Sequence, residues 1–235
     1  SRVPYDKGFS FLNFIESVIG EERMLKVLRA WVDKFKYKAA KSDDFKEIVS
    51  QTLSGEADFD ECWTKIDWDM WLHQPGLPKE IIRYDSTLIK EAKETAQRVI
   101  NGETIGDEVA FLKETTPVTN KQQRIFLDQL VIESAKVTLE MLEKLDATFK
   151  FTESKNSEIC CTWFLLGTKL LYPPVREPMK KFLGDQGRMK YVRPLFREFV
   201  AVDQEGARAT FQANADFYHP ICAQLLKKDL GISGQ

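Results

Sequence analysis

Apolar residues recur at helical spacing along almost the whole chain. Phe11, Phe14 and Ile15 begin one such series, and a second follows over residues 25–35. Residues three and four positions apart lie on one face of an α-helix, so each series gives a helix one apolar face. No stretch alternates apolar and polar residues cleanly at the period of two that a half-buried strand requires. The sequence therefore predicts an all-α protein.

Helix boundaries follow from residues that start or stop helices. Gly20 suits the left-handed position after the first helix, and Ser42, followed by two aspartates, is expected to cap the third. Thr119 with Gln122 three residues later has the pattern of a capping box. The expected helices cover 42–53, 87–101, 107–113, 120–134, 136–148 and 156–171, and later ones begin at Pro173-Pro174, Pro194 and Pro220.

The segment from Trp71 to Pro78 contains two prolines and a glycine, which block helix continuation. We expect a domain boundary there, with a first domain over 1–74, a Pro/Gly linker over 75–85 and a second domain over 86–235. Short loops in the second domain would join its helices into successive antiparallel pairs. Such pairs favour a curved α-solenoid.

Composition limits the classes of function open to this chain. Its 235 residues carry a formal net charge of −2, and no apolar run approaches the ~18 residues of a membrane-spanning helix. The N-terminus lacks the apolar stretch of a signal peptide, and the four cysteines suit buried, reduced thiols, so a cytoplasmic protein with no membrane partner is expected. The two histidines, His73 and His219, are too far apart in sequence to build a histidine-based metal motif.

The most basic part of the chain lies between residues 176 and 197, where seven basic residues stand against two acidic ones. A cationic pocket on a protein of nearly neutral charge indicates recognition of a small anion such as a carboxylate. A nucleic-acid surface would need a wider basic face, so no nucleic-acid partner is expected. The basic residues are Arg176, Lys180, Lys181, Arg188, Lys190, Arg193 and Arg197.

Three stretches, in order along the chain, carry a resemblance to one family. They are 3–9 (Val-Pro-Tyr-Asp-Lys-Gly-Phe), 71–78 (Trp-Leu-His-Gln-Pro-Gly-Leu-Pro) and 187–196 (Gly-Arg-Met-Lys-Tyr-Val-Arg-Pro-Leu-Phe). Weaker similarity covers 156–159 and 218–230. Together they resemble the leukotriene-A(4) hydrolase and aminopeptidase B branch of the zinc aminopeptidases. Three collinear motifs are far more specific than any one of them alone.

The resemblance implies that this chain is the C-terminal part of such an enzyme. The helical tail of a thermolysin-like catalytic domain would be followed by an α-α superhelix of the armadillo-like kind. Family members bind catalytic zinc through a His-Glu-x-x-His helix and a second glutamate, which neither His73 nor His219 can supply. Zinc is therefore expected in the intact enzyme, with none bound by this chain. The isolated chain is expected to be inactive, and its partners include the missing N-terminal and catalytic regions of the same protein.

Tyr5 matches the family tyrosine that hydrogen-bonds the oxyanion formed when water attacks the peptide carbonyl. A phenol suits this catalytic role because it stays protonated at neutral pH and can donate to developing negative charge. The alternative is that Tyr5 only packs at a helix start beside Pro4.

Arg188 and Lys190 match the positions that grip the free carboxylate of a short peptide, or of a fatty-acid epoxide in the hydrolase members. Residues two apart diverge on a helix, so both can reach one anion only from a loop or a first helical turn after Gly187. The alternative is a solvated basic face with ion pairs to Glu177 and Glu198.

Two functions remain open from the sequence. The leading hypothesis is the C-terminal portion of a zinc metallo-aminopeptidase that recognises short peptides with a free C-terminal carboxylate, with lipid epoxides as a second substrate class. The rival is a non-catalytic α-helical scaffold, or a pseudoenzyme module that binds acidic peptide termini. Arg193 and Arg197, four positions apart, are expected to have structural roles under either hypothesis.

Overall fold

The computed structural model describes residues 3–76, 85–106, 109–113 and 116–232. All regular structure in these ranges is helical, so the predicted all-α fold is confirmed. Most of the expected linker, and the start of the helix expected at 107, lie outside the described residues. Within the described ranges, no helix combines the length and the apolar character needed to cross a membrane.

The chain divides into two compact units, Ser1–Tyr84 and Asp85–Gln235, each with its own core. The helices of the first unit are α1 (Val3–Ile19), α2 (Glu21–Phe35), α3 (Ser42–Leu53), α4 (Phe59–Thr64) and α5 (Trp68–Leu72). α2 packs between α1 and α3, and Ile15, Val27 and Val49 are fully buried in this core. Gly20 separates the first two helices with a φ of 87°, a value that favours glycine.

An aromatic cluster connects the ends of the first unit's sequence. The ring of Phe11 lies 5.4 Å from that of Trp68, edge to face, and 5.0 Å from that of Trp71, stacked. Trp63 adds a third tryptophan at 5.1 Å from Trp68. Aromatic pairs at these separations contribute beyond the apolar area they bury. The cluster therefore fixes α5 against α1, far from it in sequence.

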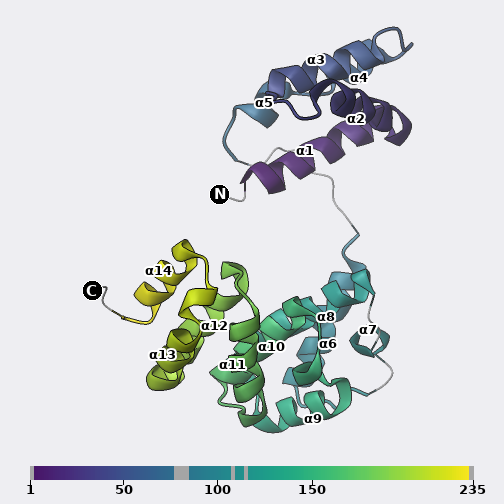
Figure 1. Cartoon of the computed structure of the whole chain (residues 1–235). Coiled ribbons are helices and arrows are strands. Elements are labelled where there is room, and N and C mark those ends of the chain that lie inside the picture. Colours follow the sequence, from purple (N-terminus) through teal and green to yellow (C-terminus); the bar gives the residue numbers. More distant parts are fainter. Residues whose placement is uncertain (1–2, 77–84, 107–108, 114–115, 233–235) are drawn as a thin grey trace. The chain divides into compact units, whose positions relative to one another are not determined.

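The second unit stacks alternate helices against one another (Figure 1). Its α-helices are α6 (Thr87–Ile100), α7 (Ala110–Lys113), α8 (Pro117–Ile132), α9 (Leu139–Phe149), α10 (Ser157–Lys169), α11 (Arg176–Asp185), α12 (Met189–Val202), α13 (Gln204–Ala213) and α14 (Pro220–Asp229). Short 3-10 helices lie between some of them: η1 (Ser134–Lys136), η2 (Phe151–Glu153), η3 (Pro173–Val175) and η4 (Ala215–Phe217). α6 packs on α8, α8 on α10, α10 on α12 and α12 on α14. Helices two apart along the chain are therefore neighbours.

Trp163 lies at the centre of the second unit's core, on α10. Its side chain is fully buried, and its ring lies 5.2 Å from Phe151 and 6.0 Å from Tyr172. The indole Nε1 donates to Thr152 Oγ1 at 2.8 Å, which satisfies the one polar atom that burial would otherwise leave unpaired. This residue therefore joins η2 to α10.

Two predicted helix caps are wrong in detail. α3 begins at Ser42, but the Lys41 backbone N–H before it donates to Asp44 Oδ2 at 2.7 Å, so the carboxylate provides the contact expected from the Ser42 hydroxyl. α8 begins one turn earlier than expected, after Thr116. The backbone N–H groups of Thr116 and Thr119 each donate to the other's hydroxyl, at 2.8 and 3.1 Å. Thr119 therefore belongs to the capping box as its third helical residue rather than as the cap.

The prediction that Pro194 begins a helix is wrong. α12 begins at Met189, and Pro194 is its sixth residue. Proline there removes the N–H that would bond to the Lys190 carbonyl, a cost that the apolar face of α12 offsets. Tyr191, Leu195 and Phe199 belong to this buried face. Packing thus decides this helix start against local preference.

Replacing Lys150 by glycine is expected to raise the free energy of unfolding by about 0.5–1 kcal/mol, because Lys150 holds a left-handed backbone (φ 55°, ψ 39°) after α9. Lys144→Gly, on an exposed position inside the same helix, is the matched control and should lower it by about 1 kcal/mol. Chemical denaturation of the two variants checks this. Equal destabilisation would contradict the assignment of backbone strain to Lys150.

Candidate functional site

The basic segment forms the start of α12. Arg188 is the residue before the first helical turn, with extended backbone (φ −80°, ψ 119°), and Lys190 is the second helical residue. The Arg188 carbonyl accepts from the backbone N–H groups of Tyr191 and Val192 at 2.9 and 3.1 Å, which closes the first turn. Both basic residues therefore occupy the loop-to-helix junction after Gly187, the arrangement that convergence on one anion requires.

Glu158 is the centre of the polar contacts at this junction. Lys190 Nζ and the Tyr191 hydroxyl both donate to Glu158 Oε1, the latter at 2.7 Å, and Arg124 Nη1 donates to Oε2. Asn156 caps α10 by accepting from the Glu158 N–H at 2.9 Å, which places the carboxylate in the first turn of that helix. Negative charge is favoured at a helix N-terminus. One carboxylate thus joins α8, α10 and α12.

Arg188 differs from its basic neighbours, because none of the described carboxylates pairs with it. Its guanidinium carbon lies 5.8 Å from the centre of the Tyr191 ring, and Lys190 Nζ lies 5.4 Å from the same ring. Within the part of the chain that the structure describes, no carboxylate lies at ion-pair distance from Arg188, whose side chain is exposed. The Tyr191 ring restricts where the exposed guanidinium turns.

Charge counting identifies Arg188 as the source of the excess positive charge. Arg124, Lys190 and Arg188 supply three positive charges, and Glu158 with Asp128, whose Oδ2 lies 3.3 Å from Arg124 Nε, supplies two negative charges. Among these described residues, three positive charges less two negative charges leave one positive charge, which is on Arg188. This arrangement can attract a single small anion.

Lys190 pairs with Glu158. This acceptor is neither of the two glutamates, Glu177 and Glu198, that the alternative expects. Glu177 Oε1 accepts from Lys180 at 2.7 Å. Sequence reasoning missed Glu158, although its motif, Asn-Ser-Glu-Ile, lies in the 156–159 stretch that resembles the family. An acidic residue after an asparagine cap was the available signal, because it fixes a carboxylate at a helix start.

Arg193 and Arg197 contact Asp229 and join α12 to α14. Arg193 donates from Nε at 2.8 Å and from Nη2 at 3.1 Å, and Arg197 donates from Nη2 at 2.9 Å. The two arginines share one face of α12, although Pro194 between them does not begin the helix. These contacts occupy both side chains in holding two helices together.

Asp229→Asn is expected to lower stability at neutral pH, with the difference shrinking in acid. The Arg193 hydrogen bond lowers the pKa of the Asp229 carboxyl, against the opposing effect of burial and with added help from Arg197. The pKa of Asp229 in the folded state lies below its unfolded value near ~3.9. The ionised carboxylate therefore stabilises the fold above that pH, and this stabilisation is lost as pH falls through the folded pKa. Chemical denaturation from neutral pH to strong acid measures it. Asp216→Asn, an exposed aspartate of the same unit, is the control, and an equal pH dependence in both variants would contradict the assignment.

Tyr5 lies in the first turn of α1, in the first unit. Its side chain is 79% exposed, and it lines a shallow cavity of about 400 Å³ with Phe9, Phe45 and Trp68 among the other walls. The structure gives the phenol no hydrogen bond to another described residue. Of the three predicted site residues, the structure brings Arg188 and Lys190 together, and Tyr5 belongs to the other unit.

A resident metal does not fit the described residues. Among them, no group of three or more histidine, cysteine, aspartate and glutamate side chains could hold an ion. The four cysteines are buried free thiols, and burial raises the pKa of Cys161 to about 11, which disfavours the thiolate that a metal requires. His219 instead caps α14, where its Nδ1 accepts from the Ile221 N–H at 3.2 Å.

Two family models match the chain in succession. The model of the peptidase family M1 domain matches residues 1–71, and the model of the leukotriene A4 hydrolase C-terminal domain matches residues 118–230. The second match contains Glu158, Arg188, Lys190 and Asp229. The first contains Tyr5 and the aromatic cluster of α1 and α5.

Relatives along the whole chain agree with these matches. Leucine aminopeptidase 2 of Aspergillus niger is 32% identical over 98% of this chain and 37% of its own length, and that of Ajellomyces capsulatus is 33% identical over the same shares. The solved structure of native leukotriene A4 hydrolase from Saccharomyces cerevisiae is 25% identical, with a TM-score of 0.79 over 98% of this chain and 39% of that one. This chain thus spans little more than a third of the length of these relatives. It belongs to the leukotriene A4 hydrolase branch of the M1 peptidase family and corresponds to the C-terminal part of its members.

Proposed function

We propose that this chain is the C-terminal part of a zinc aminopeptidase and supplies residues that recognise short peptides with a free carboxylate. The observation that carries the proposal is Arg188, an exposed guanidinium with no described carboxylate beside it, at the position that the family motif marks for carboxylate recognition. The fungal relatives, named leucine aminopeptidase 2, support a peptide substrate. In this proposal the first unit belongs to the catalytic domain and the second is the C-terminal helical solenoid.

The two basic residues take different parts in the proposed recognition. A planar guanidinium binds a carboxylate through two parallel hydrogen bonds, whereas an ammonium acts as a point charge. Arg188 therefore binds the substrate directly. Lys190, whose ammonium group already donates to Glu158, adds positive potential beside it. A lipid epoxide that carries a free carboxylate would meet the same pair, so such lipids form the second proposed substrate class.

Tyr5 is proposed to donate a hydrogen bond to the negative charge that develops on the peptide carbonyl oxygen. Its exposed phenol has no hydrogen bond to another described residue, so the donor is available to a substrate. Donors aimed at charge that appears only in the transition state accelerate the reaction without tightening substrate binding. This role belongs to the intact enzyme, and the isolated chain is expected to be inactive.

Zinc in the intact enzyme would act as a Lewis acid on the peptide carbonyl. Its ligands would come from residues outside this chain, since the described residues hold no group suited to a metal. A cytoplasmic location is part of the proposal and is supported by four cysteines that are all free thiols.

The parent reading frame and its product test this function together. The sequence before Ser1 is expected to encode a His-Glu-x-x-His motif, and the whole protein is expected to cleave aminoacyl p-nitroanilides. A chelator should abolish that activity and added zinc should restore it, while residues 1–235 alone should show none. An upstream sequence without the motif, or a whole protein without activity, would favour the scaffold hypothesis.

A further inference from the structure

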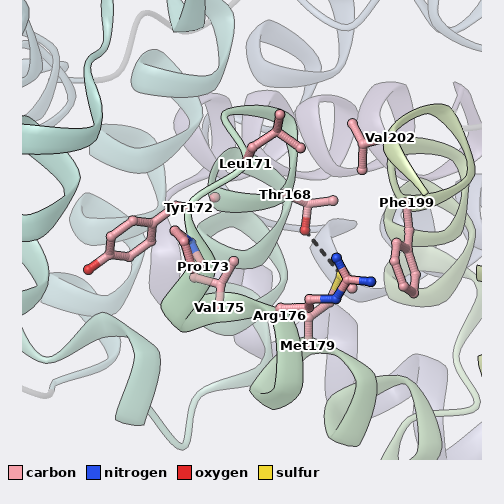
Figure 2. Close-up of a pocket in the computed structure, with 10 residues that line it drawn as sticks. Thr168, Leu171, Tyr172, Pro173, Val175, Arg176, Met179, Phe199 and Val202 are labelled. Carbon is pink, nitrogen blue, oxygen red and sulfur yellow. Dashed lines mark hydrogen bonds between the residues drawn. The ribbon is translucent and has the colours of Figure 1, made fainter. Parts of the chain in front are cut away.

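A second cavity, separate from the start of α12, opens where the end of α10 meets η3, α11 and the end of α12 (Figure 2). Its volume is about 160 Å³. Val175, Met179 and Phe199, which are all buried, form its apolar wall. An apolar cavity of about 150 Å³ accommodates a molecule of the size of benzene. The space therefore fits a compact apolar group of about six non-hydrogen atoms.

The buried hydroxyl of Thr168 faces this cavity and donates to a poor acceptor. Thr168 is only 7% exposed, and its Oγ1 donates to Met179 Sδ at 3.1 Å, the contact drawn as a dashed line in Figure 2. A thioether sulfur is a weak acceptor, and a buried donor without a good acceptor costs free energy. An oxygen atom brought in by a ligand would give Thr168 a stronger partner than any that the described residues supply.

A cation stands at the rim of the same cavity. The Arg176 side chain is 54% exposed, and its Nη2 donates to Asp203, which also accepts from the Gly206 N–H at 2.8 Å. The guanidinium has five N–H donors in a fixed fork, so one edge can hold Asp203 while another meets a second carboxylate. Figure 2 shows the Thr168 hydroxyl and the Arg176 guanidinium on the side of the pocket where Phe199 and Val202 lie. The Tyr172 ring points the other way.

The rim also carries an apolar side chain held at the cost of backbone strain. Leu171 has a φ of 57° and is 65% exposed. The Tyr172 N–H donates to the Gly167 carbonyl at 2.8 Å, so Leu171 occupies the left-handed position after α10 that glycine usually fills. A non-glycine residue in this conformation is strained. Leucine in place of glycine keeps apolar surface beside the opening.

We propose that this pocket binds a small apolar carboxylate of about the size of benzoate. The carboxylate accepts from Thr168 and from the open edge of Arg176, and the apolar body lies against Met179, Phe199 and the rim residue Leu171. A neutral molecule of the same shape gains the apolar contacts but not the charged hydrogen bond. The site is independent of the recognition proposed for Arg188.

Titration of the purified chain with benzoate, followed by ligand-observed NMR, tests this site. Saturable binding is expected with a dissociation constant of about 0.1–10 mM, the range open to nine non-hydrogen atoms. Arg176→Met should weaken it about tenfold and Thr168→Val about threefold. Benzyl alcohol, of similar size but neutral, should bind about tenfold more weakly than benzoate.

Lys181→Met is the matched control, because Lys181 is an exposed cation on the same helix as Arg176. This variant should bind benzoate as the unaltered chain does. Val202→Trp, at the partly exposed rim, should block the opening, and its thermal melting curve verifies that the variant is folded. The proposal fails if benzoate does not saturate, or if Arg176→Met and Lys181→Met bind it equally.

Discussion

Replacing Tyr5 by phenylalanine in the intact enzyme is expected to lower kcat by about 100- to 1000-fold, with little change in KM. The substitution keeps the ring and removes only the hydroxyl, which is exposed and has no hydrogen bond to another described residue. The loss falls on kcat because the negative charge that the hydroxyl stabilises develops only during the reaction. Steady-state kinetics with a series of dipeptides measures the two constants separately.

Tyr37→Phe provides the matched control for that experiment. Tyr37 is a fully exposed tyrosine of the same unit, so removing its hydroxyl should leave both constants unchanged. If Tyr5→Phe raises KM and spares kcat, the hydroxyl binds the ground state and the role assigned to it is wrong. Activity equal to that of Tyr37→Phe would remove Tyr5 from the site altogether.

Replacing Arg188 by alanine is expected to lower kcat/KM for free-carboxylate peptides by about 30- to 900-fold, equivalent to about 2–4 kcal/mol of transition-state binding. Arg188 is the cation at the start of α12 without a described carboxylate partner, so its loss is not offset by release of an internal ion pair. Lys181→Ala, another exposed cation of the basic segment, is the control for net charge and should change kcat/KM little. Equal effects of the two substitutions would contradict a specific contact.

The contacts of Glu158 explain why Lys190 should matter less than Arg188. Lys190 already donates to Glu158, and the Tyr191 hydroxyl and Arg124 hold the same carboxylate. A substrate carboxylate that reached Lys190 would have to share it with this internal acceptor. Direct binding is therefore proposed for Arg188, and Lys190 is expected to contribute less.

Much of the fold follows from local patterns in the sequence. Helical spacing of apolar residues predicts the helices, and the expected ends at Gly20 and Leu53 agree with α1 and α3. Pro220 also begins α14 as its residue type favours. Pro194 shows the limit, because the buried face of α12 extends on both sides of it and outweighs the preference of proline for the first turn.

Part of the candidate site could be predicted from the sequence, and part of it depends on how the helices pack. The motif around Arg188 places both basic residues after Gly187, and the structure puts them at the expected loop-to-helix junction. The role of Glu158 could not be predicted from spacing, because its partners Arg124 and Lys190 lie more than thirty positions away in either direction. Only the packing of α8, α10 and α12 brings those side chains to one carboxylate.

The most direct test of the central claim combines one enzyme substitution with one substrate change. Peptides with a free C-terminal carboxylate and their amidated counterparts are compared on the intact enzyme, with and without Arg188→Ala. A specific contact predicts that Arg188→Ala lowers kcat/KM strongly for the acids and weakly for the amides, a coupling of about 2–4 kcal/mol. Equal losses for acids and amides would show that Arg188 does not bind the substrate carboxylate.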